Sequence, residues 1–183
     1  RPMDRVSKPL INMNANIKTS NGKPPIFISP VDEIKNVDHK IHIASAQIKS
    51  AVMLAGLYGR DSFTITTPKS RDHTEIMLKE FGCNITLESD SINVIPSKLT
   101  SPKTIDIPGD ISSAAFFIVG FIISRDSQVK IENVGLNPLR TGFIDILKMM
   151  GATIEISDLK TVNGEVVGNI DVESSSLEGI TIP

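Results

Sequence analysis

A helix-then-strand pattern that occurs three times constrains the fold of this chain more than any other feature. The pattern runs through "RPMDRVSKPLINMNANIKT", "SRDHTEIMLKEFGCNITLES" and "NPLRTGFIDILKMMGATIEIS". Gly82 and Gly151 each follow an amphipathic run, where glycine ends a helix because it adopts positive φ at little cost. Asn14 stands at the same place in the first stretch. Aligning the two glycines also aligns Arg71 with Arg140, so the stretches are copies of one unit.

The segments before the second and third copies also match each other. "HKIHIASAQIKSAVMLAGLYGRDSFTITTP" reads as strand, helix and strand, and "KTIDIPGDISSAAFFIVGFIISRDSQVKIENV" repeats it, including the triplet "RDS". One full unit is therefore strand, helix, strand, helix, strand, strand over roughly 65–70 residues. The chain holds the back half of one unit, a second at about 37–98 and a third at about 103–183. Asn163-Gly164 predicts a hairpin turn inside the third.

The two helices of each unit differ in polarity. The first, at 48–57 and 111–123, is apolar all round, which predicts burial on every side. The second is amphipathic, and strands such as 84–88 and 91–95 alternate apolar with polar residues, which predicts one solvated sheet face. These patterns predict a mixed α/β fold, an inverted α/β barrel or prism of βαβαββ repeats with buried helices and outer sheets. The segment "PSKLTSPK" separates two domains, 1–101 and 102–183.

Composition excludes several classes of function. The net charge is −2 and Trp is absent, so neither nucleic acid nor an anionic membrane is expected as a partner. The single Cys83 rules out an internal disulfide and fits a reducing, cytoplasmic compartment. The apolar runs are too short to span a bilayer. His39, His42 and His73 show no metal-ligand spacing, so no metal or cofactor is expected.

The triplet "SAQ", Ser45-Ala46-Gln47, opens the first apolar helix after a short strand. Free backbone N–H groups and the helix dipole make such an end a binding site for anions. Ser45 either only caps the helix or also binds a ligand, and the sequence favours neither role over the other. Gln47 favours a ligand more strongly, because its amide needs several hydrogen-bond partners at the edge of a core.

The stretch "SRDHTE" opens the amphipathic helix of the same unit. Asp72 and Glu75 have the spacing of a capping box, which gives them a structural role. Arg71 opposes the helix dipole, so a nearby phosphate or carboxylate would relieve it. His73 is interpreted as a surface or hydrogen-bonded residue rather than a catalyst.

Two further helix starts carry charged residues. Arg1 precedes Pro2, and proline is favoured at the first helical position, so Arg1 stands beside a helix N-terminus as Arg71 does. In "PGDISSAAFF", Asp110 is expected to cap the apolar helix, with a hydrogen bond to a ligand as the alternative.

The motifs "RPMDR", "ASAQIKSAVMLAGL", "SRDHTEIML", "PGDISSAAFFIV" and "NVGLNPLRTGFIDILKMMGA" together resemble the 5-enolpyruvylshikimate-3-phosphate synthase family. The resemblance covers nearly the whole chain and keeps the motif order. A related enolpyruvyl transferase acts on UDP-N-acetylglucosamine and shares the fold, but "SAQ" and "SRDHTE" are similar to the shikimate enzyme. That family has two lobes, each of three βαβαββ units, with the active site in the cleft between them.

The resemblance implies transfer of the enolpyruvyl group of phosphoenolpyruvate to the 5-hydroxyl of shikimate 3-phosphate, with release of phosphate, in aromatic amino-acid synthesis. It implies that Ser45, Ala46 and Gln47 contact shikimate 3-phosphate, with Gln47 also near phosphoenolpyruvate. By the same resemblance Arg71 binds shikimate 3-phosphate and Arg1 pairs with phosphoenolpyruvate. The family is the target of glyphosate, and "SRDHTE" is similar to its glyphosate-tolerant branch.

The catalytic Asp and Glu motifs of that family, and its N-terminal Lys-Ser and Arg site, do not occur in this chain. The resemblance therefore implies a central piece of a monomeric enzyme, inactive alone: residues 1–101 end the first lobe, and 102–183 form the first unit of the second. Two alternatives stay open. One is a non-catalytic module that binds phosphorylated small molecules, and the other is a structural fragment whose exposed faces drive self-association.

Overall fold

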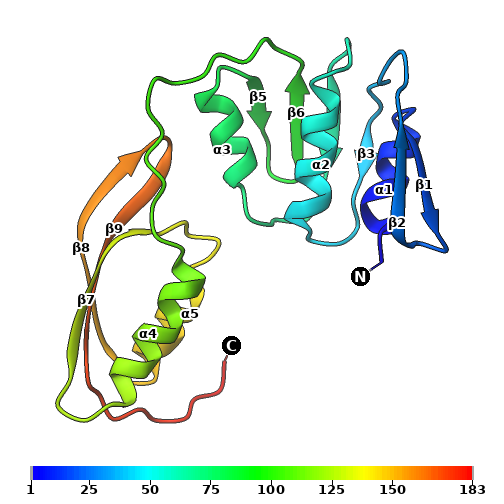
Figure 1. Ribbon diagram of the computed structural model, residues 1–183. Helices are drawn as coiled ribbons and strands as arrows, with labels where there is room; N and C mark the ends of the chain where they lie inside the picture. Colours follow the sequence, from blue (N-terminus) through cyan, green and yellow to red (C-terminus); the bar gives the residue numbers. More distant parts are fainter. Residues whose placement is uncertain (1, 183) are drawn as a thin grey trace. The chain divides into compact units, whose positions relative to one another are not determined.

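The computed structural model describes residues 2–182 and consists of two compact units, 1–102 and 103–183 (Figure 1). The elements of the first unit are, in chain order, α1 (Asp4–Asn12), β1 (Asn16–Ser20), β2 (Lys23–Ser29), β3 (His39–Lys40), α2 (Ala46–Gly56), β4 (Phe63–Thr66), α3 (His73–Glu80), β5 (Asn84–Leu87) and β6 (Ser91–Ile95).

The sheet of the first unit has the strand order β3-β4-β6-β5. The β3–β4 pair is parallel, as a strand–helix–strand crossover requires, and the other two pairs are antiparallel. Val52 and Met53 of α2 and Leu78 of α3 share one buried cluster with Phe63 and Ile65 of β4. Both helices therefore pack on this sheet, and the order strand, helix, strand, helix, strand, strand predicted for this copy is confirmed. α1 and the antiparallel β1–β2 hairpin precede it.

All three amphipathic helices end in the same way. Asn14, Gly82 and Gly151 have φ values of 73°, 81° and 100°, the left-handed conformation predicted for them. In each, the N–H of the following residue donates to a carbonyl five residues earlier, which is the Schellman ending. These bonds run from Ala15 to Leu10, from Cys83 to Leu78 and from Ala152 to Leu147, at 3.0, 2.8 and 3.0 Å.

The second unit has a three-stranded antiparallel sheet in the order β7-β9-β8. The predicted turn at Asn163-Gly164 is confirmed: both residues have positive φ and join β8 to β9. Buried residues of both helices form one cluster with this sheet. The elements are α4 (Ile111–Ile123), β7 (Gln128–Gly135), α5 (Gly142–Met149), β8 (Thr153–Val162) and β9 (Glu165–Glu173).

The first strand expected in this unit, in "KTIDIP" before the apolar helix, does not form: residues 104–107 have no strand structure. The Asn163 side chain takes up part of this segment's backbone bonding: its Oδ1 accepts from the Asp106 N–H at 3.0 Å and its Nδ2 donates to the Thr104 carbonyl at 3.4 Å. Only a single parallel bridge, from Gly109 to Val134, remains where a parallel strand pair was expected. Side-chain hydrogen bonds have replaced the ladder here.

Burial on every side, predicted for both apolar helices, is not observed for either within the described residues: Leu54 of α2 is 48% exposed, and α4 shows the larger departure. Ile111, Ala114, Ile118 and Ile122 are buried against the sheet, whereas Phe116 and Phe117 on the other face are 82% and 62% exposed. One three-stranded sheet can cover only one face of a helix, and the described residues of this unit leave Phe116 and Phe117 largely uncovered.

This contrast within one helix predicts unequal costs of truncation. Ile118→Ala is expected to lower the free energy of unfolding of the second unit by about 2–5 kcal/mol, because it leaves a cavity in the core. Phe117→Ala, its neighbour on the exposed face, is expected to cost less than about 1 kcal/mol. Urea denaturation of both variants measures the difference. Equal losses would show that the outer face of α4 is covered in solution.

Candidate functional site

The candidate site begins at the N-terminus of α2. Ser45 is the N-cap residue, with an extended backbone, and its Oγ accepts a hydrogen bond from the Ile48 N–H at 3.4 Å. The capping role weighed for Ser45 is therefore present, although the bond is long for its type. A hydroxyl that accepts at a cap still has its own proton to donate. Capping and ligand binding by Ser45 are thus compatible.

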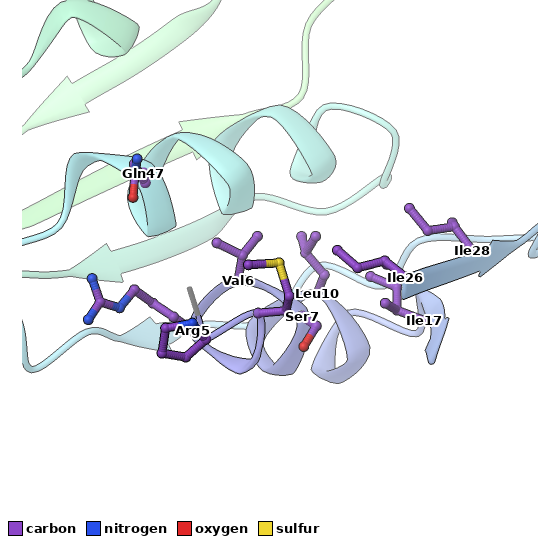
Figure 2. Close-up of a pocket in the computed structure, with 10 residues that line it drawn as sticks. Arg5, Val6, Ser7, Leu10, Ile17, Ile26, Ile28 and Gln47 are labelled. Carbon is purple, nitrogen blue, oxygen red and sulfur yellow. The ribbon is translucent and has the colours of Figure 1, made fainter. Parts of the chain in front are cut away.

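Gln47 lies on the exposed side of the first turn of α2 and lines a pocket of about 640 Å³. Figure 2 shows the Gln47 amide and the Arg5 guanidinium at one end of this pocket and Ile17, Ile26 and Ile28 toward the other. Arg5 was not predicted as a site residue, although it belongs to the motif "RPMDR". Arg1 lies outside the described residues.

Glu75 is not part of a capping box, contrary to the sequence-based expectation. Asp72 stands at the N-cap of α3, but its side chain makes no capping hydrogen bond to the helix. The Glu75 carboxylate instead forms an ion pair with the Lys49 ammonium of α2, and both side chains are only 3% exposed. A lysine buried in an apolar helix requires a counter-charge, and that demand places Glu75 in the core rather than at the cap.

Lys49 also reaches the loop that carries Arg71. Its Nζ donates to the Arg71 carbonyl at 2.9 Å and approaches the Ser70 carbonyl at 3.5 Å. Lys49 is one helical turn beyond Ser45, so this bond brings the Arg71 backbone close to the start of α2. The Arg71 side chain itself is exposed. Lys49 stands out in the sequence as a charged residue in the first turn of a largely apolar helix, but no role was predicted for it.

The second unit has a charged pair at the matching helix start. Asp110 caps α4, as expected, by accepting from the N–H and Oγ of Ser113 at 3.0 and 2.9 Å. Arg140 Nη2 donates to Asp110 Oδ1 at 2.6 Å and to Ser112 Oγ at 2.7 Å. The Arg140 guanidinium, helped by Ser113, lowers the pKa of the Asp110 carboxyl from 3.8 to about 2. Asp110 is therefore ionised at neutral pH and paired.

A pH titration tests this pair. Because the folded pKa lies below the unfolded value of 3.8, the pair is expected to stabilise the unit fully above that value and to lose its effect as pH falls toward 2. In Arg140→Gln the pKa of Asp110 should rise toward 3.8. Carboxyl ¹³C NMR follows the titration directly. Arg125→Gln, which removes a cation elsewhere in the unit, should leave the pKa of Asp110 unchanged; a shift there would argue against a specific pair.

Neither a metal site nor a membrane span can be built from residues 2–182. No three His, Cys, Asp or Glu side chains of this part of the chain gather to hold a metal ion. None of its helices is long and apolar enough to cross a membrane.

The chain is similar to known proteins along its whole length. A curated relative in Hydrogenovibrio crunogenus is 46% identical, and one in Thermodesulfovibrio yellowstonii is 48% identical. Both are called 3-phosphoshikimate 1-carboxyvinyltransferase, and the alignments cover 100% of this chain. The chain spans 43% of the length of each of these relatives.

Solved structures agree with the sequence relatives. EPSP synthase from Acinetobacter baumannii is 41% identical and superimposes with a TM-score of 0.87 over 100% of this chain and 42% of that one. The enolpyruvyl transferase NikO from Streptomyces tendae shares the fold, with a TM-score of 0.71 at 12% identity over 95% of this chain and 42% of that one. The mixed α/β fold class predicted from the repeats is thus confirmed. The family model for EPSP synthase (3-phosphoshikimate 1-carboxyvinyltransferase) matches residues 1–182, and the chain therefore belongs to that family.

Proposed function

We propose that the full-length protein transfers the enolpyruvyl group of phosphoenolpyruvate to the 5-hydroxyl of shikimate 3-phosphate, and that this chain supplies part of the shikimate 3-phosphate site. In the transfer the 5-hydroxyl loses its proton and its oxygen adds to C2 of phosphoenolpyruvate, while a proton adds to C3. Loss of phosphate from C2 and of a proton from C3 then restores the double bond. Family membership and the names of the relatives support this activity.

The observation that carries the site assignment is the Arg140–Asp110 pair of the second unit. Aligning the two "RDS" triplets places Ser45 opposite Asp110 and Gln47 opposite Ser112, and Arg71 is the counterpart of Arg140. In the second unit an arginine at this position holds a carboxylate and a polar side chain at a helix start. The first unit has the neutral Ser45 where that carboxylate stands. A phosphate or carboxylate from a ligand would complete the same arrangement there.

Shikimate 3-phosphate has the chemistry that this helix start favours. Its phosphate suits the Arg71 fork and the free N–H groups of the first turn of α2, which include that of Ala46. Its hydroxyls suit the Ser45 hydroxyl and the Gln47 amide, which both donate and accept. We assign these four residues to shikimate 3-phosphate, place Gln47 also near phosphoenolpyruvate, and assign Arg1 to phosphoenolpyruvate. We further propose that the full-length enzyme is a cytoplasmic monomer that uses no cofactor.

A segment exchange tests the function. Residues 1–183 would replace the matching segment of the Acinetobacter baumannii EPSP synthase, to which they are 41% identical. The hybrid is expected to release phosphate from the two substrates, whereas the 183-residue chain alone is not. A Gln47→Ala hybrid controls for the site. A folded hybrid that binds shikimate 3-phosphate without turnover would favour a binding module, and one that binds neither substrate would contradict the proposal.

A further inference from the structure

Lys49 is an unusual residue for the place it occupies. It lies near the start of α2, between Ile48 and Ser50, and its side chain is 3% exposed. Removing an ammonium group from water is costly unless its donors are satisfied. All three donors of this ammonium face oxygen: Glu75 Oε1 of α3, and the carbonyls of Ser70 and Arg71. The carboxylate balances the charge, and the two carbonyls connect Lys49 to a loop.

The fold itself does not require this ion pair. The repeat aligns Lys49 with Ala114 and Glu75 with Ile144, and these two residues are 7% and 1% exposed in the core of the second unit. The equivalent two positions are therefore buried apolar residues in one copy and a buried ion pair in the other. Since apolar replacements of buried ion pairs are often neutral or stabilising, stability alone gives no reason for the pair.

The loops that carry the two arginines are held differently. In the second unit Arg140 pairs directly with Asp110, and the Leu139 N–H donates to Asn137 Oδ1 at 2.9 Å. In the first unit Ser45 replaces the carboxylate, so Arg71 has no matching acidic partner at that position. Residues 67–72 form neither helix nor strand. The bonds from Lys49 to the Ser70 and Arg71 carbonyls attach the backbone of this loop to α2.

We infer that Lys49, neutralised by Glu75, is a positioning residue that fixes the Ser70–Arg71 backbone beside the first turn of α2. Arg71 is thereby held, before any ligand binds, in a position to contact the same ligand as Ser45 and Gln47. The inference rests on the proposed function for the identity of that ligand, shikimate 3-phosphate. Ordering the loop in advance raises affinity, because the backbone entropy is not lost on binding.

The test transplants the apolar pair of the second unit into the first. Lys49→Ala/Glu75→Ile in the 183-residue chain removes both charges together and so leaves no buried ion without a partner. ¹⁵N relaxation of the free protein is expected to show order parameters at residues 70–71 falling from about 0.85 to below about 0.6. In the hybrid with the Acinetobacter baumannii enzyme, calorimetric titration of the double variant with shikimate 3-phosphate is expected to show binding about tenfold weaker.

Ser50→Ala is the matched control. Ser50 Oγ contacts Thr74 Oγ1 at 2.6 Å, so this variant removes another α2–α3 contact without touching the two loop carbonyls. Loop order and affinity should both stay at the parent values. If Ser50→Ala lost as much loop order and affinity as the double variant, Lys49 would have only a general packing role.

The two readouts separate this inference from the proposed function. A loop that stays rigid in the double variant overturns the anchoring, whatever the affinity does. A mobile loop with unchanged shikimate 3-phosphate affinity overturns the link to binding. If the hybrid without these substitutions shows no binding at all, the ligand assignment fails, and relaxation of the free 183-residue chain still decides whether Lys49 holds the loop.

Discussion

Lys49→Ala alone is expected to lower the free energy of unfolding of the first unit by about 3–5 kcal/mol. The change would leave the Glu75 carboxylate buried without its counter-charge, and Glu75 Oε2 already has no hydrogen-bond partner among the described residues. Glu75→Ile alone is expected to cost a similar amount, because it strands the ammonium. Such a loss is a large part of the total stability of an ordinary domain. Urea denaturation with a constant m-value measures it.

The double variant and a surface pair make this prediction specific. Lys49→Ala/Glu75→Ile should recover most of the lost stability, so the two single effects should be strongly non-additive. Lys8 pairs with Asp4 at 3.2 Å on the surface of α1, where the two side chains are 73% and 42% exposed. Lys8→Ala should therefore change stability by less than about 1 kcal/mol. Single core variants that behave like Lys8→Ala would mean that the Lys49–Glu75 pair is solvated.

Arg71→Ala is expected to weaken shikimate 3-phosphate binding by about 1.5–3 kcal/mol, the usual value of a hydrogen bond to a charged group. The hybrid with the Acinetobacter baumannii enzyme is the suitable protein, and calorimetric titration is the measurement. The thermal midpoint should change little, because the Arg71 side chain is exposed and its carbonyl, which Lys49 binds, is retained in alanine. Arg71→Lys should not restore full affinity, because an ammonium lacks the planar fork of a guanidinium.

Arg60→Ala is the control for loss of positive charge. Arg60 is 86% exposed, follows the C-terminal end of α2 and pairs with Glu33 at 3.3 Å. It should leave affinity for shikimate 3-phosphate unchanged at physiological salt. If Arg71→Ala instead binds as tightly as the parent but melts at a much lower temperature, Arg71 has a structural role and the site assignment is wrong.

Local chemistry explains which features could be predicted from the sequence. The helix ends at Asn14, Gly82 and Gly151 depend on the φ preference of one residue and on hydrogen bonds to the preceding turn, so a short stretch contains the needed information. The turn at Asn163-Gly164 is local in the same sense. Asp110 was expected at a cap and is found there, because its partner Ser113 is three residues away.

The predictions that were wrong all depended on residues far apart in the sequence. Asp72 and Glu75 have the spacing of a capping box, yet Glu75 pairs with Lys49, a residue of another helix. The 104–107 segment has an apolar-polar alternation, yet it bonds the side chain of Asn163, far along the chain. An apolar composition indicated that α4 is buried, but which face meets a neighbour depends on the elements that pack against it. In each of these cases the partner lies on another element of the fold, so nearby residues cannot identify it.

By itself, therefore, the sequence determined the repeated unit, the ends of its helices and the polar residues at the start of α2, because all of these follow from short-range preference and periodicity. Only the tertiary structure decided that Lys49 and Glu75 meet in the core and that Lys49 holds the backbone of Arg71. The physical reason is that a buried charge selects its partner by distance and desolvation in the folded state. Residues 26 positions apart became neighbours through the packing of α2 on α3, which no local pattern specifies.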